Sequence, residues 1–261
     1  MPPTDRMSSS NALDVSSQHY ENFHRSSNTS WIHSSDYLEF WCDKVIDLLD
    51  LQDQDCFLDI GCGDGELTTK ISQCVNFSQT PIGVEQDTIC FSWDERYLQS
   101  EQMLADDFFA QAEDTFDKIL LKQVIHHMYR PDHTDVLEKV FCCLNPGGKV
   151  LILSMPDSLE YPLFSQAVER FEAQESEFNI IQLEEDLVAK GFSVSSEKIT
   201  YETTLPKEKY LQAVSERFIS TLSTFSDAEM RQGLEELDKD LSSEVHVKDP
   251  LIALLAQRPE H

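Results

Sequence analysis

The hydrophobic positions of the chain change repeatedly between helical and strand-like spacing. Apolar residues recur at helical spacing over 35–51, behind Ser35 or Asp36, either of which is a suitable N-cap. The apolar run 56–60 then stops at a glycine-rich turn, and helical spacing resumes after it. This part of the sequence predicts helix, strand, glycine turn and helix.

The same alternation continues along the chain. A helix over about 134–144 and the turn Asn145-Pro146-Gly147-Gly148 come before one further apolar run. Strands that alternate with helices at this spacing favour an α/β fold, in which a mainly parallel Rossmann-like sheet is covered on both faces. The strands predicted after the glycine turn span 81–85, 102–105, 116–121 and 149–154.

The C-terminal part has a different pattern. Two more strands are predicted over 192–200 and 251–256, with two amphipathic helices between them. Pro206 suits the first position of a helix over about 206–222, and Ser226 begins a capping box for a helix over about 226–241. We interpret residues 204–248 as a helical insertion that caps a substrate site.

Composition and charge restrict the possible functions. The chain has 48 acidic and 20 basic residues, a formal net charge of −28, which disfavours nucleic acid and anionic membranes as partners. No apolar run approaches the ~18–20 residues that span a bilayer, so we expect a cytoplasmic protein. Residues 1–30 are rich in Ser and Asn and predict a disordered tail, followed by one domain over 31–261.

The seven cysteines form no repeated C-x-x-C pattern. We predict reduced, mostly buried thiols rather than disulfides or a zinc site, and no metal. The cysteines on which this prediction rests lie in apolar or glycine-rich stretches: Cys56, Cys62, Cys142 and Cys143.

Candidate chemistry begins at the glycine turn Gly61-x-Gly63-x-Gly65. A glycine turn between a strand and a helix lets the backbone approach a ligand closely, and the helix N-terminus offers unpaired N–H groups. Glu85 ends the next strand about 20 residues later, where a carboxylate can accept both ribose hydroxyls of an adenosine ligand. The combination predicts a nucleoside cofactor.

Two acidic residues discriminate between NAD and other nucleoside cofactors. The dinucleotide pattern has glycine at the sixth place of the turn, where this chain has Glu66, and Asp59 lies just before the turn. Both carboxylates disfavour a pyrophosphate and suit a ligand that carries an ammonium and a sulfonium. The expected cofactor is therefore S-adenosyl-L-methionine.

The ordered motifs resemble those of class I S-adenosylmethionine-dependent methyltransferases. The resemblance covers about residues 35–257 and implies a seven-stranded sheet whose last strand is antiparallel. The helical insertion before that strand is similar to those of small-molecule members such as trans-aconitate and juvenile-hormone-acid methyltransferases. The motifs that carry the resemblance are Leu58-Asp59-Ile60-Gly61-Cys62-Gly63-Asp64-Gly65, Gly83-Val84-Glu85, Ala105-Asp106, Phe116-Asp117 and Leu144-Asn145-Pro146-Gly147-Gly148.

The resemblance also implies roles for individual residues. Glu85 would hold the ribose, Gln86 would flank the adenine, and Asp106 would accept from the adenine amino group. Asp107 and Phe108 would lie beside Asp106, and Gln123 would face the methionyl part. The methionine end would contact Asp59, Gly61, Cys62 and Gly63.

The acceptor site is less well marked in the sequence. His126 and His127 follow the fourth strand and are candidate catalytic bases, because histidine accepts protons near neutral pH; a packing role is the alternative. Trp31, Tyr37 and Arg217 are candidate substrate contacts, with core or surface roles as alternatives. The expected acceptor is a small metabolite methylated on N, O or S.

Alternatives from other classes remain open. A protein or nucleic-acid methyltransferase would share the cofactor motifs, but N6-adenine types have Asn or Asp-Pro-Pro-aromatic where this chain has Lys122-Gln123-Val124-Ile125. A non-catalytic cofactor-binding module would fit a degraded glycine turn, and this turn is intact. An NAD-dependent oxidoreductase ranks last, and the oligomeric state is open.

Overall fold

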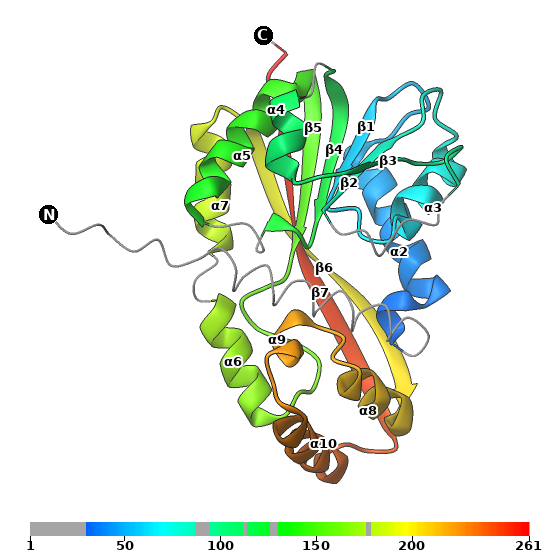
Figure 1. Cartoon of the computed structure of the whole chain (residues 1–261), viewed down its shortest axis with the longest axis vertical. Coiled ribbons are helices and arrows are strands. Elements are labelled where there is room, and N and C mark those ends of the chain that lie inside the picture. Colours follow the sequence, from blue (N-terminus) through cyan, green and yellow to red (C-terminus); the bar gives the residue numbers. More distant parts are fainter. Residues whose placement is uncertain (1–29, 87–93, 112–113, 126–129, 176–178, 261) are drawn as a thin grey trace, which may run out of the picture. The chain divides into compact units, whose positions relative to one another are not determined.

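The computed structural model describes residues 30–86, 94–111, 114–125, 130–175 and 179–260. The chain forms one seven-stranded sheet in these ranges, and Figure 1 shows its strands in the order β3-β2-β1-β4-β5-β7-β6. The strands are β1 (Phe57–Ile60), β2 (Ile82–Glu85), β3 (Gln99–Gln102), β4 (Phe116–Lys122), β5 (Leu144–Ser154), β6 (Ser193–Pro206) and β7 (Glu244–Gln257).

Strand directions agree with the predicted fold. The pairs β3–β2, β2–β1, β1–β4 and β4–β5 are parallel, and β7 pairs with β5 in the antiparallel direction. The α/β class and the antiparallel last strand are therefore confirmed. The helices are η1 (Trp31–His33), α2 (Ser35–Leu49), α3 (Glu66–Val75), α4 (Ala105–Gln111), α5 (Arg130–Cys143), α6 (Ser165–Glu175), α7 (Ile180–Ala189), α8 (Lys207–Ser215), α9 (Ser220–Ser223) and α10 (Asp227–Asp240).

Contacts divide the chain into two compact units. We call one the sheet unit; it comprises 34–161, 172–202 and 248–261. We call the other the helical unit; among the described residues it comprises 30–33, 162–171 and 203–247.

The sheet unit has a continuous apolar core. All four residues of β1 are buried, and α4, α5 and α7 pack their apolar faces against one side of the sheet. Helices α2 and α3 pack against each other beside the other face (Figure 1). Burial of this apolar area is the main favourable term in the folding of the unit.

The helical unit has a smaller core of aromatic rings. Trp31 stacks on Tyr210, with ring centroids 5.7 Å apart, and meets the edge of Phe218 at 4.5 Å. Phe164 packs against Phe225, and a Cβ at Gly233 would lie 2.5 Å from the Phe164 ring. Glycine at position 233 therefore lets α10 approach this ring closely.

The third strand lies three residues earlier than the predicted 102–105. The observed β3 consists of four polar residues at the sheet edge. Of the apolar residues that suggested a strand, Met103 and Leu104 lie between β3 and α4, and Ala105 is the first residue of α4. An edge strand buries little surface, so hydrophobicity does not mark it.

The prediction of one helix over 206–222 is also wrong. Helix α8 ends at Ser215, Arg217 has a left-handed φ of +58°, and α9 begins at Ser220. Pro206 is the N-cap of α8 rather than its first residue, and β6 extends to it. The predicted capping box at Ser226 is confirmed.

Two smaller predictions need correction. The N-cap of α2 is Ser34, whose hydroxyl accepts from the Tyr37 N–H at 3.2 Å, rather than Ser35 or Asp36. The prediction of mostly buried thiols is wrong, because only Cys42 and Cys62 are buried among the described cysteines and Cys142 is exposed at the end of α5. Helices α6 and α7 were not predicted, and most of the tail over 1–30 lies outside the described residues.

Candidate functional site

The glycine turn is held tightly between two strands of the sheet unit. The N–H groups of Gly61 and Cys62 donate to the Val84 carbonyl at 2.7 and 3.2 Å. Gly61 has φ +71°, and a Cβ there would lie 2.1 Å from Cγ2 of Val124. Gly63 has φ +57°, and a Cβ at this position would meet no atom within 4 Å. The turn is thus fixed on its Gly61 side and open at Gly63.

Glu85 is joined directly to this turn. Its carboxylate accepts from the Gly63 N–H at 3.2 Å and from the Gln86 N–H at 2.8 Å, and the residue is only 3% exposed. Charge-assisted hydrogen bonds from backbone donors stabilise a buried carboxylate. The glycine turn and the predicted ribose acid therefore form one structural unit.

Asp59 is a buried carboxyl group at the end of β1. It is 3% exposed and accepts a hydrogen bond from the hydroxyl of Thr68 on α3. Burial raises the pKa of Asp59 to about 7, opposed by the Thr68 hydrogen bond and by the charge of Lys122. Asp59 is consequently poised to change its charge near neutral pH.

A second polar group lies at the end of β4. The Lys122 ammonium donates to the Gln123 side chain at 3.2 Å and lies 5.7 Å from the ring centroid of Tyr37. Burial lowers the pKa of Lys122, and the charges of Asp249 and Asp59 oppose this effect. Gln123 has a left-handed φ of +55°, and its N–H donates to the Leu153 carbonyl at 2.7 Å.

Asp249 and Ser154 complete this group. Since Ser154 pairs with Ile252 in antiparallel register, Asp249 lies past the carboxyl end of β5. Asp249 is 5% exposed and interacts with the Tyr37 hydroxyl, and burial together with the Asp249 charge raises the pKa of Tyr37. Ser154 is 1% exposed, and its hydroxyl has no hydrogen-bond partner among the described residues. We call Tyr37, Lys122, Ser154 and Asp249 the β4-edge cluster.

The glycine turn and the β4-edge cluster both lie where the strand order reverses. β1 is flanked by β2 and β4, so the chain winds in opposite directions from the β1–β4 pair. Open α/β sheets bind ligands in the crevice at the carboxyl ends of such strands. Asp59 and Gly61 lie at the end of one strand of this pair, and Lys122 lies at the end of the other.

The charges around the turn fit a cationic ligand better than a pyrophosphate. Asp59, Asp64, Glu66 and Glu85 contribute carboxylates, and Lys122 is close enough to Asp59 and Asp64 for their charges to raise its pKa. Repulsion between these acids and a pyrophosphate would be strong in a partly buried site. An ammonium and a sulfonium would instead be stabilised.

The predicted adenine contacts are not all gathered at this turn. Asp106 lies on α4, is exposed, and forms an ion pair of 2.6 Å with Lys139 of α5. Asp107 is exposed on the same helix, whereas Phe108 is buried in the apolar core. Gln86 directly follows Glu85 and is half-buried.

The predicted acceptor contacts are distributed over both units. Tyr37 belongs to the sheet unit, and Trp31 belongs to the aromatic core of the helical unit. The Arg217 guanidinium donates to the Phe225 carbonyl at 3.0 Å and pairs with Asp227 at 2.9 Å. His126 and His127 lie outside the described residues.

Sequence reasoning missed Thr68, Lys122, Ser154 and Asp249. Thr68 follows Gly65 by three residues, so its helical position was a usable signal for its proximity to the turn. Asp249 had no such signal, because its place depends on the antiparallel register of a strand about 130 residues after Lys122.

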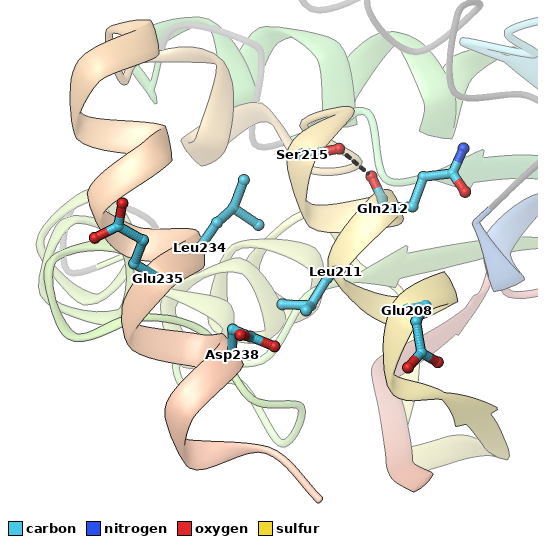
Figure 2. Close-up of a pocket in the computed structure, with 7 residues that line it drawn as sticks. All are labelled: Glu208, Leu211, Gln212, Ser215, Leu234, Glu235 and Asp238. Carbon is cyan, nitrogen blue, oxygen red and sulfur yellow. Dashed lines mark hydrogen bonds between the residues drawn. The ribbon is translucent and has the colours of Figure 1, made fainter. Parts of the chain in front are cut away.

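The helical unit contains a separate surface groove of about 450 Å³ between α8 and α10. Figure 2 shows Leu211 and Leu234 between the two helices, with the carboxylates of Glu208, Glu235 and Asp238 around them. None of the predicted cofactor residues lines this groove. It is therefore distinct from the glycine turn.

Two other kinds of feature are absent from the part of the chain that the structure describes. No group of three or more His, Cys, Asp or Glu side chains there is arranged to hold a metal ion. No helix in those ranges combines the length and apolar character needed to cross a membrane.

Comparisons with known proteins agree with this geometry. A family model described as "Methyltransferase domain" matches residues 33–196, more than half of the chain. Among solved structures, phosphoethanolamine N-methyltransferase 2 of Haemonchus contortus is 17% identical with a TM-score of 0.57. The match covers 92% of this chain and 57% of that chain, so this chain corresponds to little more than half of that enzyme.

Two other solved structures match over nearly their whole length. The cyclopropane synthase MmaA2 of Mycobacterium tuberculosis is 14% identical with a TM-score of 0.59, and the match covers 98% of this chain and 100% of that chain. A SAM-dependent methyltransferase of Archaeoglobus fulgidus is 15% identical with a TM-score of 0.54, covering 85% and 94%. At these identities the structural likeness shows the fold.

Proposed function

The chain belongs to the methyltransferase-domain family, and on that basis we propose that it transfers the methyl group of S-adenosyl-L-methionine to an N, O or S atom of a small metabolite. The observation that carries the cofactor assignment is the bond between the Gly63 N–H and the buried Glu85 carboxylate. It joins the glycine turn to the ribose acid within an acidic environment that a sulfonium ligand fits.

We assign the cofactor contacts to residues around this turn. Asp59, with the backbone of Gly61, Cys62 and Gly63, binds the methionine end, and Gln123 faces it from the end of β4. Glu85 binds the ribose hydroxyls. Gln86, Asp106, Asp107 and Phe108 are proposed for the adenine side, where Asp106 must exchange its Lys139 ion pair for the adenine amino group.

The bound cofactor supplies an electrophilic methyl group on a sulfonium with a good leaving group. The protein contributes alignment and exclusion of water, and alignment alone can lower the barrier by several kcal/mol. Asp59 stabilises the ammonium of the methionine end when it is ionised. A base is required only for an acceptor that arrives protonated, and His126 and His127 remain the candidates for that role.

We propose that the β4-edge cluster faces the methyl acceptor. Lys122 of this cluster directly precedes Gln123 at the carboxyl end of β4, and the Ser154 hydroxyl is a buried polar group without a partner among the described residues. Buried polar groups are normally hydrogen-bonded, so a polar acceptor atom is a suitable partner. Trp31 and Arg217 remain proposed acceptor contacts from the helical unit, and the insertion over 204–248 remains a proposed cap.

The net charge of the chain supports one part of the proposed acceptor class. A formal net charge of −28 disfavours nucleic acid, which argues against a nucleic-acid methyltransferase. A protein acceptor and a non-catalytic role remain the alternatives, and a cytoplasmic location remains a prediction.

Binding and transfer can be tested separately. S-adenosylmethionine or S-adenosylhomocysteine should raise the melting temperature of the purified chain, because a ligand selective for the native state stabilises it. NADH is the control, and a shift with NADH alone would refute the cofactor assignment. Incubation with labelled S-adenosylmethionine and fractionated extract should place label in small molecules, whereas label in macromolecules would refute the acceptor class.

A separate variant tests the proposed acceptor site. Ser154→Ala removes the hydroxyl and keeps the buried position nearly isosteric. Once an acceptor is identified, we expect a several-fold increase in its KM with unchanged cofactor affinity, because the two sites use separate residues. An unchanged KM would exclude Ser154 from the acceptor site.

A further inference from the structure

Two cysteines of the sheet unit meet where α2 and α3 pack together. Cys42 lies on α2 and Cys74 lies near the end of α3, 32 residues later in the sequence. Their Sγ atoms are 3.9 Å apart, with the Cys42 thiol donating to the Cys74 sulfur. A disulfide requires about 2.05 Å between the sulfur atoms, so they must approach by about 1.9 Å.

The two thiols differ in access to solvent. Cys42 is 0% exposed, whereas Cys74 is at the surface. Burial and the neighbouring Cys74 sulfur raise the pKa of Cys42 to about 12. An oxidant in solution therefore reaches Cys74 first, and Cys42 is held beside it as a protonated thiol.

We propose that Cys42 and Cys74 form a reversible disulfide when a hydroperoxide oxidises the protein, and that this bond ties α2 to α3. Attack by the Cys74 sulfur breaks the peroxide O–O bond and gives a sulfenic acid, with water or an alcohol released. The Cys42 sulfur then attacks the sulfenic sulfur. The S–S bond forms, the S–O bond breaks, and the oxygen leaves as water with the Cys42 proton.

The electrons balance in this sequence. Two thiols lose two electrons and two protons in total, and the hydroperoxide accepts both electrons. A dithiol reductant reverses the reaction by thiol–disulfide exchange. Because Cys74 is at the surface, we expect rotation of its side chain to provide most of the required approach.

The position of the pair links it to both ends of the candidate site. Helix α3 begins directly after Gly65 of the glycine turn, and α2 carries Tyr37 of the β4-edge cluster. The bond would thus restrain the two helices that lead from these groups. The proposal itself concerns a covalent modification and does not depend on methyl transfer.

The test is performed on the full chain. Reduced protein is treated with graded hydrogen peroxide, remaining thiols are alkylated, and peptides are mapped by mass spectrometry. Digestion must include a protease that cleaves after glutamate, because cleavage after Glu85 separates Cys74 from Cys90. We expect a linked peptide pair containing Cys42 and Cys74, which disappears after treatment with dithiothreitol.

Three variants make the result specific. In Cys42→Ala, which keeps the buried position apolar, dimedone should trap a persistent sulfenic acid on Cys74. In Cys74→Ser, neither the linked peptide nor the dimedone adduct at these positions should form. Cys142→Ser, which removes an exposed thiol of α5, is the matched control and should form the 42–74 disulfide as the wild type does.

The outcome that would overturn the proposal is measured on the wild type. If peroxide consumes the Cys74 thiol without any 42–74 link, while circular dichroism shows a folded chain, the pair is not a disulfide site. Lack of reaction at Cys74, at peroxide concentrations that oxidise Cys142, would overturn it equally.

Discussion

The acids beside the glycine turn of the sheet unit differ in burial from the charged side chains that form ion pairs in the helical unit. In the sheet unit two acids beside the glycine turn are buried: Asp59 accepts from the Thr68 hydroxyl, and Glu85 accepts from backbone N–H groups. In the helical unit the ion pairs Lys207–Asp238, Arg217–Asp227 and Arg170–Glu229 each have at least one partner well exposed to solvent. Exposed pairs contribute little stability, about 0–1 kcal/mol each.

This difference distinguishes residues with a proposed role in binding from residues that stabilise the fold. Burying a carboxylate costs free energy unless donors compensate, so buried acids supported by backbone donors indicate a binding role. The helical unit is held by its aromatic core and by the capping box at the start of α10. Variants in the two units should therefore affect different measurements.

The largest effect is expected for the two tightly packed glycines. Gly61→Ala places a Cβ 2.1 Å from Val124 at a left-handed φ and should destabilise the chain by about 2–4 kcal/mol, while weakening cofactor binding more than tenfold. Gly233→Ala, with a Cβ 2.5 Å from Phe164, should destabilise by about 1–3 kcal/mol and leave cofactor affinity unchanged. Urea unfolding measures the change in stability, and calorimetry measures the change in cofactor affinity. Equal effects of the two substitutions on cofactor affinity would contradict the distinction between the units.

Loss of Glu85, the proposed ribose acid, ranks next. Glu85→Ala should weaken S-adenosylmethionine binding by about 1–3 kcal/mol, because two hydroxyls lose a charged acceptor. The matched control is Glu229→Ala, which removes a carboxylate with local hydrogen bonds in the helical unit. Calorimetry on folded variants decides, and unchanged affinity for Glu85→Ala would mean that the ribose binds elsewhere.

The titration of Asp59 should appear in cofactor binding. Its pKa is raised to about 7, so below pH 7 the native state holds a proton that the unfolded chain releases near pH 4. This difference in proton binding contributes to the free energy of unfolding at low pH, and the contribution is lost as the pH rises from about 4 to 7. Binding of an ammonium requires the ionised carboxylate and should therefore weaken about tenfold from pH 7.0 to 5.5.

The control for this pH effect is Asp59→Asn, whose affinity should be lower and independent of pH over the same range. This range lies below the titration of a free α-amino group at about 7.7–8.0, so the ligand keeps its charge. Lys122→Met should move the transition to higher pH, because the Lys122 charge lowers the pKa of Asp59. A flat profile in the wild type would exclude Asp59 as the ammonium partner.

The smallest effect is expected for the Arg217–Asp227 pair. Asp227→Ala removes an 84% exposed partner and should lower stability by about 0.5 kcal/mol without changing cofactor affinity. Asp227→Ala keeps the Arg217 guanidinium, whereas Arg217→Ala removes it. The difference between the two variants therefore reports the effect of the guanidinium itself. If Arg217 contacts the acceptor, only Arg217→Ala raises the acceptor KM; equal KM values would assign Arg217 a structural role.

The sequence alone was sufficient for the central strands of the sheet and for the glycine turn. The buried strands around 56–60, 116–121 and 149–154 are apolar runs bounded by turns, and Glu85 follows the turn at a fixed distance within one βαβ unit. Such features are local, because parallel strands that are buried on both faces consist mostly of apolar residues. Family membership follows from the same segments.

Other features depended on tertiary structure. The polar edge strand β3 is defined by its pairing with β2, and Arg217 breaks the predicted insertion helix. The Cys42–Cys74 contact needs the packing of two helices, and the place of Asp249 needs the register of β7 against β5. The sequence determined which segments are buried, whereas packing and register decided which distant polar groups meet, because these groups carry no local hydrophobic pattern.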